Sequence, residues 1–186
     1  MGAEISLADK RESFEANALP HLDAAYNLAR WLTRSSAEAD DIVQQAMLRA
    51  FRAFDDLRGG DAKPWLLAIV RNCFLTKTRA GSGRKVIPLP ERDGEDQDFL
   101  VDGAADPEQA AILSDQRRKL HRLIGRLPDE FREALVLREM EDLSYQAIAQ
   151  VTGAPIGTVM SRLARARALL KLEWEREIEG VRNAVR

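Results

Sequence analysis

The sequence predicts an all-α protein made of two small helical domains joined by a flexible acidic linker. Apolar residues recur at intervals of three and four, which is the period of a helix with one buried face. No stretch of useful length alternates apolar and polar residues as a half-buried strand does. A chain of 186 residues is long enough for two small domains, each near the lower limit of a self-sustaining core.

The first two helical patterns lie before residue 56. The first begins near Ser13, is perturbed at Pro20 and ends near Ser35. Ser35 followed by Glu38 forms a capping-box pattern, in which each residue caps a backbone N–H of the other, and this predicts a second helix out to about Asp55.

A third helix is predicted after the paired glycines Gly59 and Gly60, with apolar positions from Trp65 to Phe74. Residues 80–107 then combine glycine, proline and acid with little periodicity, so we interpret them as a flexible connector. The predicted division is therefore 1–79 for the N-terminal domain, 80–107 for the linker and 108–186 for the C-terminal domain.

Helical periodicity returns near Pro107, and a further helix is predicted from about Asp129 to Met140. The stretch 143–170 then has the pattern of a helix-turn-helix. Ser144 is placed to cap a short first helix, and Gly153 supplies the permissive backbone of a tight turn. Pro155 is predicted at the first position of the second helix, where its missing N–H breaks no hydrogen bond.

The outward side of this second helix favours DNA. From Ile156 to Leu172 there are four basic residues and no acidic one, which suits a helix that enters a negatively charged major groove. The predicted groove-facing residues are Thr158, Ser161, Arg162 and Arg165. Arg167 and Lys171 are expected to meet phosphate or solvent, and Tyr145 either contacts phosphate or belongs to the helix cap.

Composition and charge exclude several classes of protein. The formal net charge is only −2, so nucleic-acid binding must come from local patches rather than from bulk charge. Cys73 is the only cysteine, which excludes an intrachain disulfide, and we interpret it as a small core residue. No apolar run approaches the roughly 20 residues of a membrane span. We expect a cytoplasmic protein with no metal, cofactor or small-molecule substrate, and we interpret His21 and His121 as surface or packing residues.

Three alternatives compete with this interpretation. One is a stand-alone helix-turn-helix regulator that binds a palindrome as a dimer, and another is a helical scaffold for protein partners. The third is an enzyme with Cys73 as its nucleophile, which lacks a histidine placed to activate the thiol.

Three separate segments resemble the sigma-70 factors of bacteria, in particular the extracytoplasmic-function group. They read DDIVQQAMLRAFRAF, then KPWLLAIVRN, then RLPDEFREALVLREMEDLSYQAIAQVTGAPIGTVMSRLARARALL. They stand in the family's order and separation over about residues 10 to 172. The resemblance implies a factor that binds core RNA polymerase and directs it to promoter DNA, with no covalent chemistry of its own.

The resemblance also assigns residues. The segment with Asp41, Gln44, Gln45 and Leu48 corresponds to the helix that docks on the polymerase clamp, although the family usually has glutamate where this chain has Gln45. Without the resemblance, this set is an ordinary solvated helix face.

The third helix corresponds to the family's reader of the −10 promoter element. Asn72 is expected to bond a base flipped out of the melted strand, and Arg71, Lys77 and Arg79 to hold phosphates. Trp65 and Ile69 are expected in the core. The second helix of the helix-turn-helix is expected to read the −35 element. A dedicated anti-sigma factor is a further expected partner.

Overall fold

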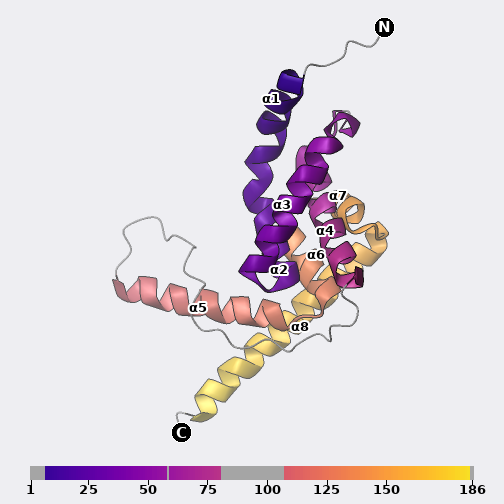
Figure 1. The fold of residues 1–186 in the computed structure, drawn as a ribbon. Helices are drawn as coiled ribbons and strands as arrows, with labels where there is room; N and C mark the ends of the chain where they lie inside the picture. Colours follow the sequence, from indigo (N-terminus) through magenta and orange to yellow (C-terminus); the bar gives the residue numbers. More distant parts are fainter. Residues whose placement is uncertain (1–6, 58, 81–106, 185–186) are drawn as a thin grey trace.

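The computed structural model describes residues 7–57, 59–80 and 107–184 (Figure 1). All regular elements within these ranges are helical, so the predicted all-α class is confirmed. Apart from its two end residues, the predicted flexible linker lies outside the described residues. The helices are α1 (Leu7–Ala18), α2 (Leu22–Thr33), α3 (Ser36–Arg52), α4 (Ala62–Ala80), α5 (Pro107–Arg126), α6 (Asp129–Glu139), α7 (Tyr145–Thr152) and α8 (Ile156–Ala184), with short 3₁₀ turns η1 (Leu19–His21) and η2 (Phe54–Asp56).

Helix α1 begins at Leu7, so the predicted start near Ser13 was wrong. The only buried residues of α1 are Phe14 and Ala18, and the apolar periodicity therefore begins late in the helix. The exposed side of α1 carries an ion pair between Arg11 and Glu15, which lie one turn apart with 2.8 Å between Nε and Oε1. Such pairs contribute only a few tenths of a kcal/mol, and they leave no apolar pattern in the sequence.

The start of α3 follows the predicted cap. The backbone N–H of Glu38 donates to Ser35 Oγ at 3.4 Å. The N–H of Ser35 donates to Thr33 Oγ1 at 3.2 Å, at the end of α2. This hydroxyl takes the place that the Glu38 side chain has in a full capping box, and it links the end of one helix to the start of the next.

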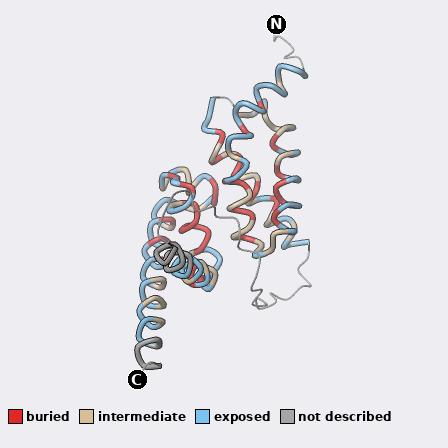
Figure 2. Tube along the Cα trace, turned by 90° about the vertical axis from the view of Figure 1, so that its left-hand side faces the viewer, coloured by how far each residue is buried: buried red, intermediate tan, exposed pale blue. Residues whose placement is uncertain are grey.

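Helices α2, α3 and α4 pack around one core, with Leu28, Ile42, Leu66 and Val70 all fully buried. The predicted core position of Cys73 is confirmed, because its side chain is 1% exposed. Helices α6, α7 and α8 form the second set, and the two sets touch where α2 meets α6 and α4 meets α7. In Figure 2 the buried residues concentrate along these helices, whereas residues 169–179 of α8 are exposed or half-buried.

Helix α5 lies against α8, which extends beyond the bundle (Figure 1). Two basic side chains of α5 share one carboxylate of α8: Lys119 and Arg126 lie 3.5 and 3.4 Å from the oxygens of Glu177. The ammonium of Lys119 also lies 4.8 Å from the ring centroid of Trp174. These contacts hold α5 against the part of α8 that follows the helix-turn-helix.

Candidate nucleic-acid interface

Helices α7 and α8 form the predicted helix-turn-helix. Ser144 Oγ accepts a hydrogen bond from the N–H of Ala147 at 3.1 Å and so caps α7, as predicted. Gly153 has φ +66°, a left-handed conformation that is strained for any residue with a Cβ. The buried side chains of Ile148, Val151 and Leu163 join the two helices. The turn and its two helices are therefore confirmed.

Pro155 was predicted as the first residue of the second helix, but α8 begins one residue later, at Ile156. The carbonyl of Pro155 accepts hydrogen bonds from the N–H groups of Thr158 and Val159, at 2.8 and 3.1 Å. Proline is therefore the capping residue of α8 rather than its first helical residue. Its carbonyl, which every residue has, performs the capping, and its missing N–H is not needed there.

One continuous face of α8 is exposed at its N-terminal end. It consists of Gly157, Met160, Ser161, Ala164 and Arg165, spaced three and four apart as one side of a helix requires. Thr158, predicted to face the groove, is half-buried instead. Its carbonyl accepts the hydroxyl of Ser161 at 2.9 Å. The exposed face therefore carries small and apolar side chains around one arginine.

The arginines of α8 differ in their partners. Arg162 Nη2 lies 2.9 Å from Glu130 Oε2, and Arg167 Nη2 lies 2.6 Å from Glu139 Oε1. The hydrogen bonds that Arg167 donates to Glu139 raise the pKa of its guanidinium. Both acids lie on α6, so these two guanidinium groups bend toward that helix. Arg165 is exposed and makes no hydrogen bond or ion pair within the described part of the chain.

Tyr145 lies at the first residue of α7 and is half-buried. The guanidinium carbon of Arg138 is 5.4 Å from the centroid of its ring. This cation–π contact fixes the ring beside the N-terminus of α7, where a phosphate is favoured by the free backbone N–H groups. The position is compatible with both roles predicted for this residue.

The residues predicted to read the −10 element all lie on the second half of α4, but not all are accessible. Asn72 and Arg79 are exposed. Lys77 Nζ lies 3.4 Å from Asp41 Oδ2. Arg71 is half-buried, and its Nε lies 2.6 Å from Oε1 of Glu133, a residue of α6.

Glu133 is a buried carboxylate with 7% of its surface exposed. Burial raises its pKa, and the neighbouring charges of Arg71 and Arg162 act in the opposite direction. Arg71 therefore meets a carboxylate of the C-terminal helices at the position where a phosphate was predicted.

The predicted polymerase-docking residues form one exposed face of α3. Asp41, Gln44, Gln45 and Leu48 are all exposed, and their spacing of three and four places them on one side of the helix. Leu48 is 57% exposed, so its side chain is accessible to a partner. The opposite side, with Ile42 and Val43, is buried in the core.

Several residues of this region were not found by sequence reasoning. Glu130, Glu133 and Glu139 pair with arginines of other helices, and Lys63 pairs with Glu141 at 3.1 Å. Arg132 is buried at 1% exposure and was not singled out either. The only sequence signal was charged residues on or beside predicted helices, which by itself indicates ordinary solvated faces.

Within the described residues, no group of three or more histidine, cysteine, aspartate or glutamate side chains is arranged to hold a metal ion. Over the same residues, no helix combines the length and the apolar character that a membrane crossing requires.

Both halves of the chain match models of known protein families. Residues 19–83 match the model of sigma-70 region 2, and residues 117–170 match that of sigma-70 region 4. The RNA polymerase sigma-H factor of Pseudomonas aeruginosa is 34% identical over 169 residues, covering 88% of this chain and 86% of that protein. The ECF RNA polymerase sigma-E factor of Escherichia coli K12 is 37% identical over 138 residues, covering 71% of each chain.

A third relative is longer. The ECF RNA polymerase sigma factor SigE of Mycolicibacterium smegmatis is 35% identical over 153 residues, which cover 81% of this chain but only 57% of that protein. Among solved structures, the sigma factor RpoE of Bartonella quintana, in complex with the anti-sigma factor NepR, has a TM-score of 0.68 at 24% identity. The match covers 88% of this chain and 98% of that one. CnrH in complex with the cytosolic domain of CnrY has a TM-score of 0.61, also at 24% identity, and covers 89% of each chain.

An N-terminal helical domain, a C-terminal helix-turn-helix and matches to regions 2 and 4 define a sigma factor of the sigma-70 type. The chain belongs to the extracytoplasmic-function group of this family. It is therefore a transcription initiation factor, a class that acts with core RNA polymerase on promoter DNA.

Proposed function

We propose that three exposed helix faces divide the work of this sigma factor. The face of α3 with Leu48 docks on core RNA polymerase, the second half of α4 contacts the melted −10 element, and the exposed face of α8 reads the −35 element. The observation that carries the assignment is the exposure of Leu48, Asn72 and Arg165 on helices whose other sides form the core. This corresponds to a division of the chain at 1–79, 80–107 and 108–186.

Within α8, we infer that Arg165 is the base-reading arginine. An arginine can pair bidentately with guanine, and such a pair contributes about 1–3 kcal/mol of discrimination. Met160 and Ala164, on the same exposed face, are suited to contact with thymine methyl groups. Arg162 and Arg167 are already held by Glu130 and Glu139. Their proposed role is to hold α8 against α6.

We further propose that the chain works in the cytoplasm without catalytic activity of its own and is controlled by an anti-sigma factor. The proposed inhibitor is supported by the two solved relatives of similar fold, one in complex with NepR and the other with the cytosolic domain of CnrY. Its expected target is the set of helix faces proposed above, because covering Leu48 or Arg165 would block an essential contact.

The test is transcription with purified core polymerase from a library of randomised promoters, with and without the protein. We expect new start sites that share two sequence elements, and no new starts when Leu48→Asp replaces the wild type. Leu48 is exposed, so this substitution should leave the fold intact. Leu172→Asp is the matched control, because Leu172 is a 43% exposed leucine of α8 outside the proposed contacts. Unchanged start sites with folded wild-type protein would refute the proposal.

A further inference from the structure

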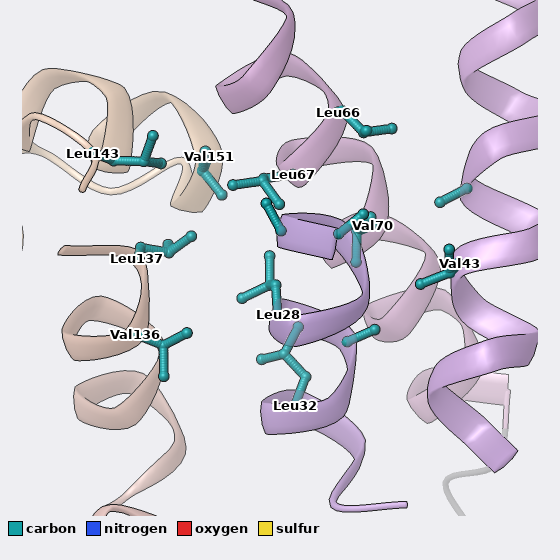
Figure 3. Packing of buried hydrophobic residues seen from close by; sticks show 14 of the residues in the cluster. Leu28, Leu32, Val43, Leu66, Leu67, Val70, Val136, Leu137, Leu143 and Val151 are labelled. Atoms are coloured by element: carbon teal, nitrogen blue, oxygen red, sulfur yellow. The ribbon is translucent and has the colours of Figure 1, made fainter. Parts of the chain in front are cut away.

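The two halves of the chain share a hydrophobic core. In Figure 3, Leu28 of α2 and Leu67 of α4 lie beside Val136 and Leu137 of α6 and Val151 of α7. The first four of these side chains have no exposed surface and Val151 has 3%, and all belong to one buried cluster. The domains are therefore packed together in this structure, and the helices at their boundary exclude water.

Polar contacts surround this shared core. Besides the Arg71–Glu133 pair, Lys63 Nζ of α4 lies 2.7 Å from the carbonyl oxygen of Glu141 and 3.1 Å from its Oε2. Arg132 Nε of α6 donates to the carbonyl of Trp31, near the end of α2, at 3.1 Å. Each contact joins an element of the N-terminal half to one of the C-terminal half.

The Arg71–Glu133 pair differs from the other two contacts. Both basic neighbours of Glu133 belong to helices that are proposed to contact DNA. Arg71 of α4 lies 2.6 Å away, and the charge of Arg162 of α8 also acts on the carboxylate. A carboxylate that accepts a charge-assisted hydrogen bond from arginine uses the same donor that a DNA phosphate would use. Glu133 and a phosphate of the melted strand therefore compete for Arg71.

We propose that Glu133 is an internal latch: it holds the domains closed by occupying Arg71, and the free chain thereby masks part of its own −10 contact surface. The masking rests on the proposed DNA role of Arg71, whereas the closure rests on the contacts between the domains alone. Binding to DNA or polymerase must separate Arg71 from Glu133 before the guanidinium can hold a phosphate.

The closed arrangement also contains unfavourable contributions that make it reversible. Glu141 is 5% exposed, and its Oε1 has no hydrogen-bond partner among the described residues. A buried carboxylate oxygen without a partner has lost its hydration and gains little in exchange. Opening would return this atom, and the Glu133 carboxylate, to water. The loss of hydration of these two carboxylates therefore offsets part of the stabilisation that the apolar contacts and the Arg71–Glu133 pair provide.

Two substitutions on α6 distinguish an ion pair that holds the domains together from an ordinary exposed ion pair. Glu133→Gln keeps the shape of the side chain but leaves the half-buried charge of Arg71 without a counter-charge, which disfavours the closed state. Glu139→Gln is the matched control: it breaks a pair of the same 2.6 Å distance, but this pair is exposed and lies within one half of the chain. Both variants are compared with wild type as full-length protein, after circular dichroism has verified their helix content.

The first measurement is small-angle X-ray scattering of the free chain. We expect a larger radius of gyration for Glu133→Gln and an unchanged one for Glu139→Gln. The second is the anisotropy of a labelled, mixed-sequence single-stranded oligonucleotide, because a phosphate contact does not depend on sequence. If about a tenth of the wild-type chain is open, full opening raises the apparent affinity about tenfold.

A wild-type scattering curve for folded Glu133→Gln would overturn the latch. Opening without a gain in oligonucleotide affinity would overturn the masking of Arg71. The double variant Arg71→Glu with Glu133→Arg provides a second test, because the exchanged pair should restore the compact form, and a folded but extended double variant would contradict a direct pair. Failure of the wild type to initiate transcription would instead refute the proposed sigma function and would leave the scattering result unaffected.

Discussion

Four arginines predicted to contact DNA fall into two groups. Arg71, Arg162 and Arg167 are paired with glutamates of α6, whereas Arg165 is exposed without such a partner among the described residues. A paired guanidinium is fixed in direction, which suits a positioning role. An exposed one keeps its donors for a base, so the pairing pattern separates Arg165 from Arg162, which the sequence alone left equal.

Arg132 illustrates how much a single residue can contribute to the fold. Its buried guanidinium donates to the carbonyls of Trp31 and Leu127, at 3.1 and 2.9 Å, and bonds Asp129 Oδ1 at 2.6 Å. We expect Arg132→Met to lower the free energy of unfolding by about 3 kcal/mol or more, because it leaves buried carbonyls without donors. Urea unfolding followed by circular dichroism measures this change.

The control for that variant is Arg176→Met. Arg176 is exposed and pairs with Glu173 at 2.7 Å within α8. Exposed pairs of this kind contribute about 0–1 kcal/mol, so the control should change stability little. Equal losses in the two variants would show that the buried hydrogen bonds of Arg132 have no special weight.

The burial of Glu133 determines how the free energy of unfolding should change with pH. Burial raises its pKa above the ordinary value of 4.5, so the folded chain binds this proton more tightly than the unfolded chain. Over the pH range between the two values, the stability contributed by Glu133 falls as pH rises. The free energy of unfolding of wild type, minus that of Glu133→Gln, should therefore decrease as pH rises from about 4.5.

Urea titrations of both proteins across that pH range provide the measurement. The Glu133→Gln variant is the control for wild type, because all other carboxylates titrate in both proteins and cancel in the difference. A difference that grows as pH rises would mean that Arg71 outweighs the burial of Glu133 and that its pKa is lowered in the folded chain.

At the scale of an element, the helix-turn-helix depends on local chemistry. Gly153 and Gly157 form a natural pair for comparison, because a Cβ at either position would meet open space. Of these two glycines, only Gly153 has a positive φ. Gly153→Ala should therefore destabilise the chain by about 1 kcal/mol through backbone strain. Gly157→Ala should instead stabilise it, by up to about 1 kcal/mol, because alanine favours a helix.

Thermal or urea unfolding of the two glycine variants decides between these effects. If Gly153→Ala proved neutral, the turn would have to relax to a conformation without a left-handed residue. If both variants destabilised the chain equally, an effect other than backbone conformation would be responsible.

Local signals explain which elements could be predicted from the sequence. The caps at Ser35 and Ser144 and the turn at Gly153 each depend on residues within four positions of one another, so the sequence displays them directly. The start of α1 was missed because its first turns bury almost nothing. The exposed candidates Asp41 and Asn72 were found through the family pattern, since an exposed polar residue has no signature of its own. Arg165 was found because it lies on the outward side of the predicted helix-turn-helix.

The contacts between the domains could not be predicted in this way. Arg71 and Glu133 are 62 positions apart, and Lys63 and Glu141 are 78 apart. Hydrophobic periodicity states which face of a helix is buried but not which helix covers it. The sequence indicated that α4 and α6 each have an apolar side, and only the structure places those sides against one another.

At the scale of the molecule, two proposed DNA-reading helices belong to different domains that share a core. The latch at Glu133 implies that they are not both available in the free chain. Binding to core polymerase must then supply the free energy that separates the domains and places the readers on separate stretches of promoter. Specific promoter recognition is therefore expected of the complex with polymerase and not of the chain alone.

Hydroxyl-radical footprinting on a promoter selected from the randomised library tests this central claim most directly. We expect protection of two stretches, at the −35 and −10 elements, with polymerase and sigma factor together and no protection with the sigma factor alone. Arg165→Ala should remove the upstream protection selectively, whereas Arg167→Ala should weaken it less. A specific footprint from the chain alone on a palindromic site would contradict the account.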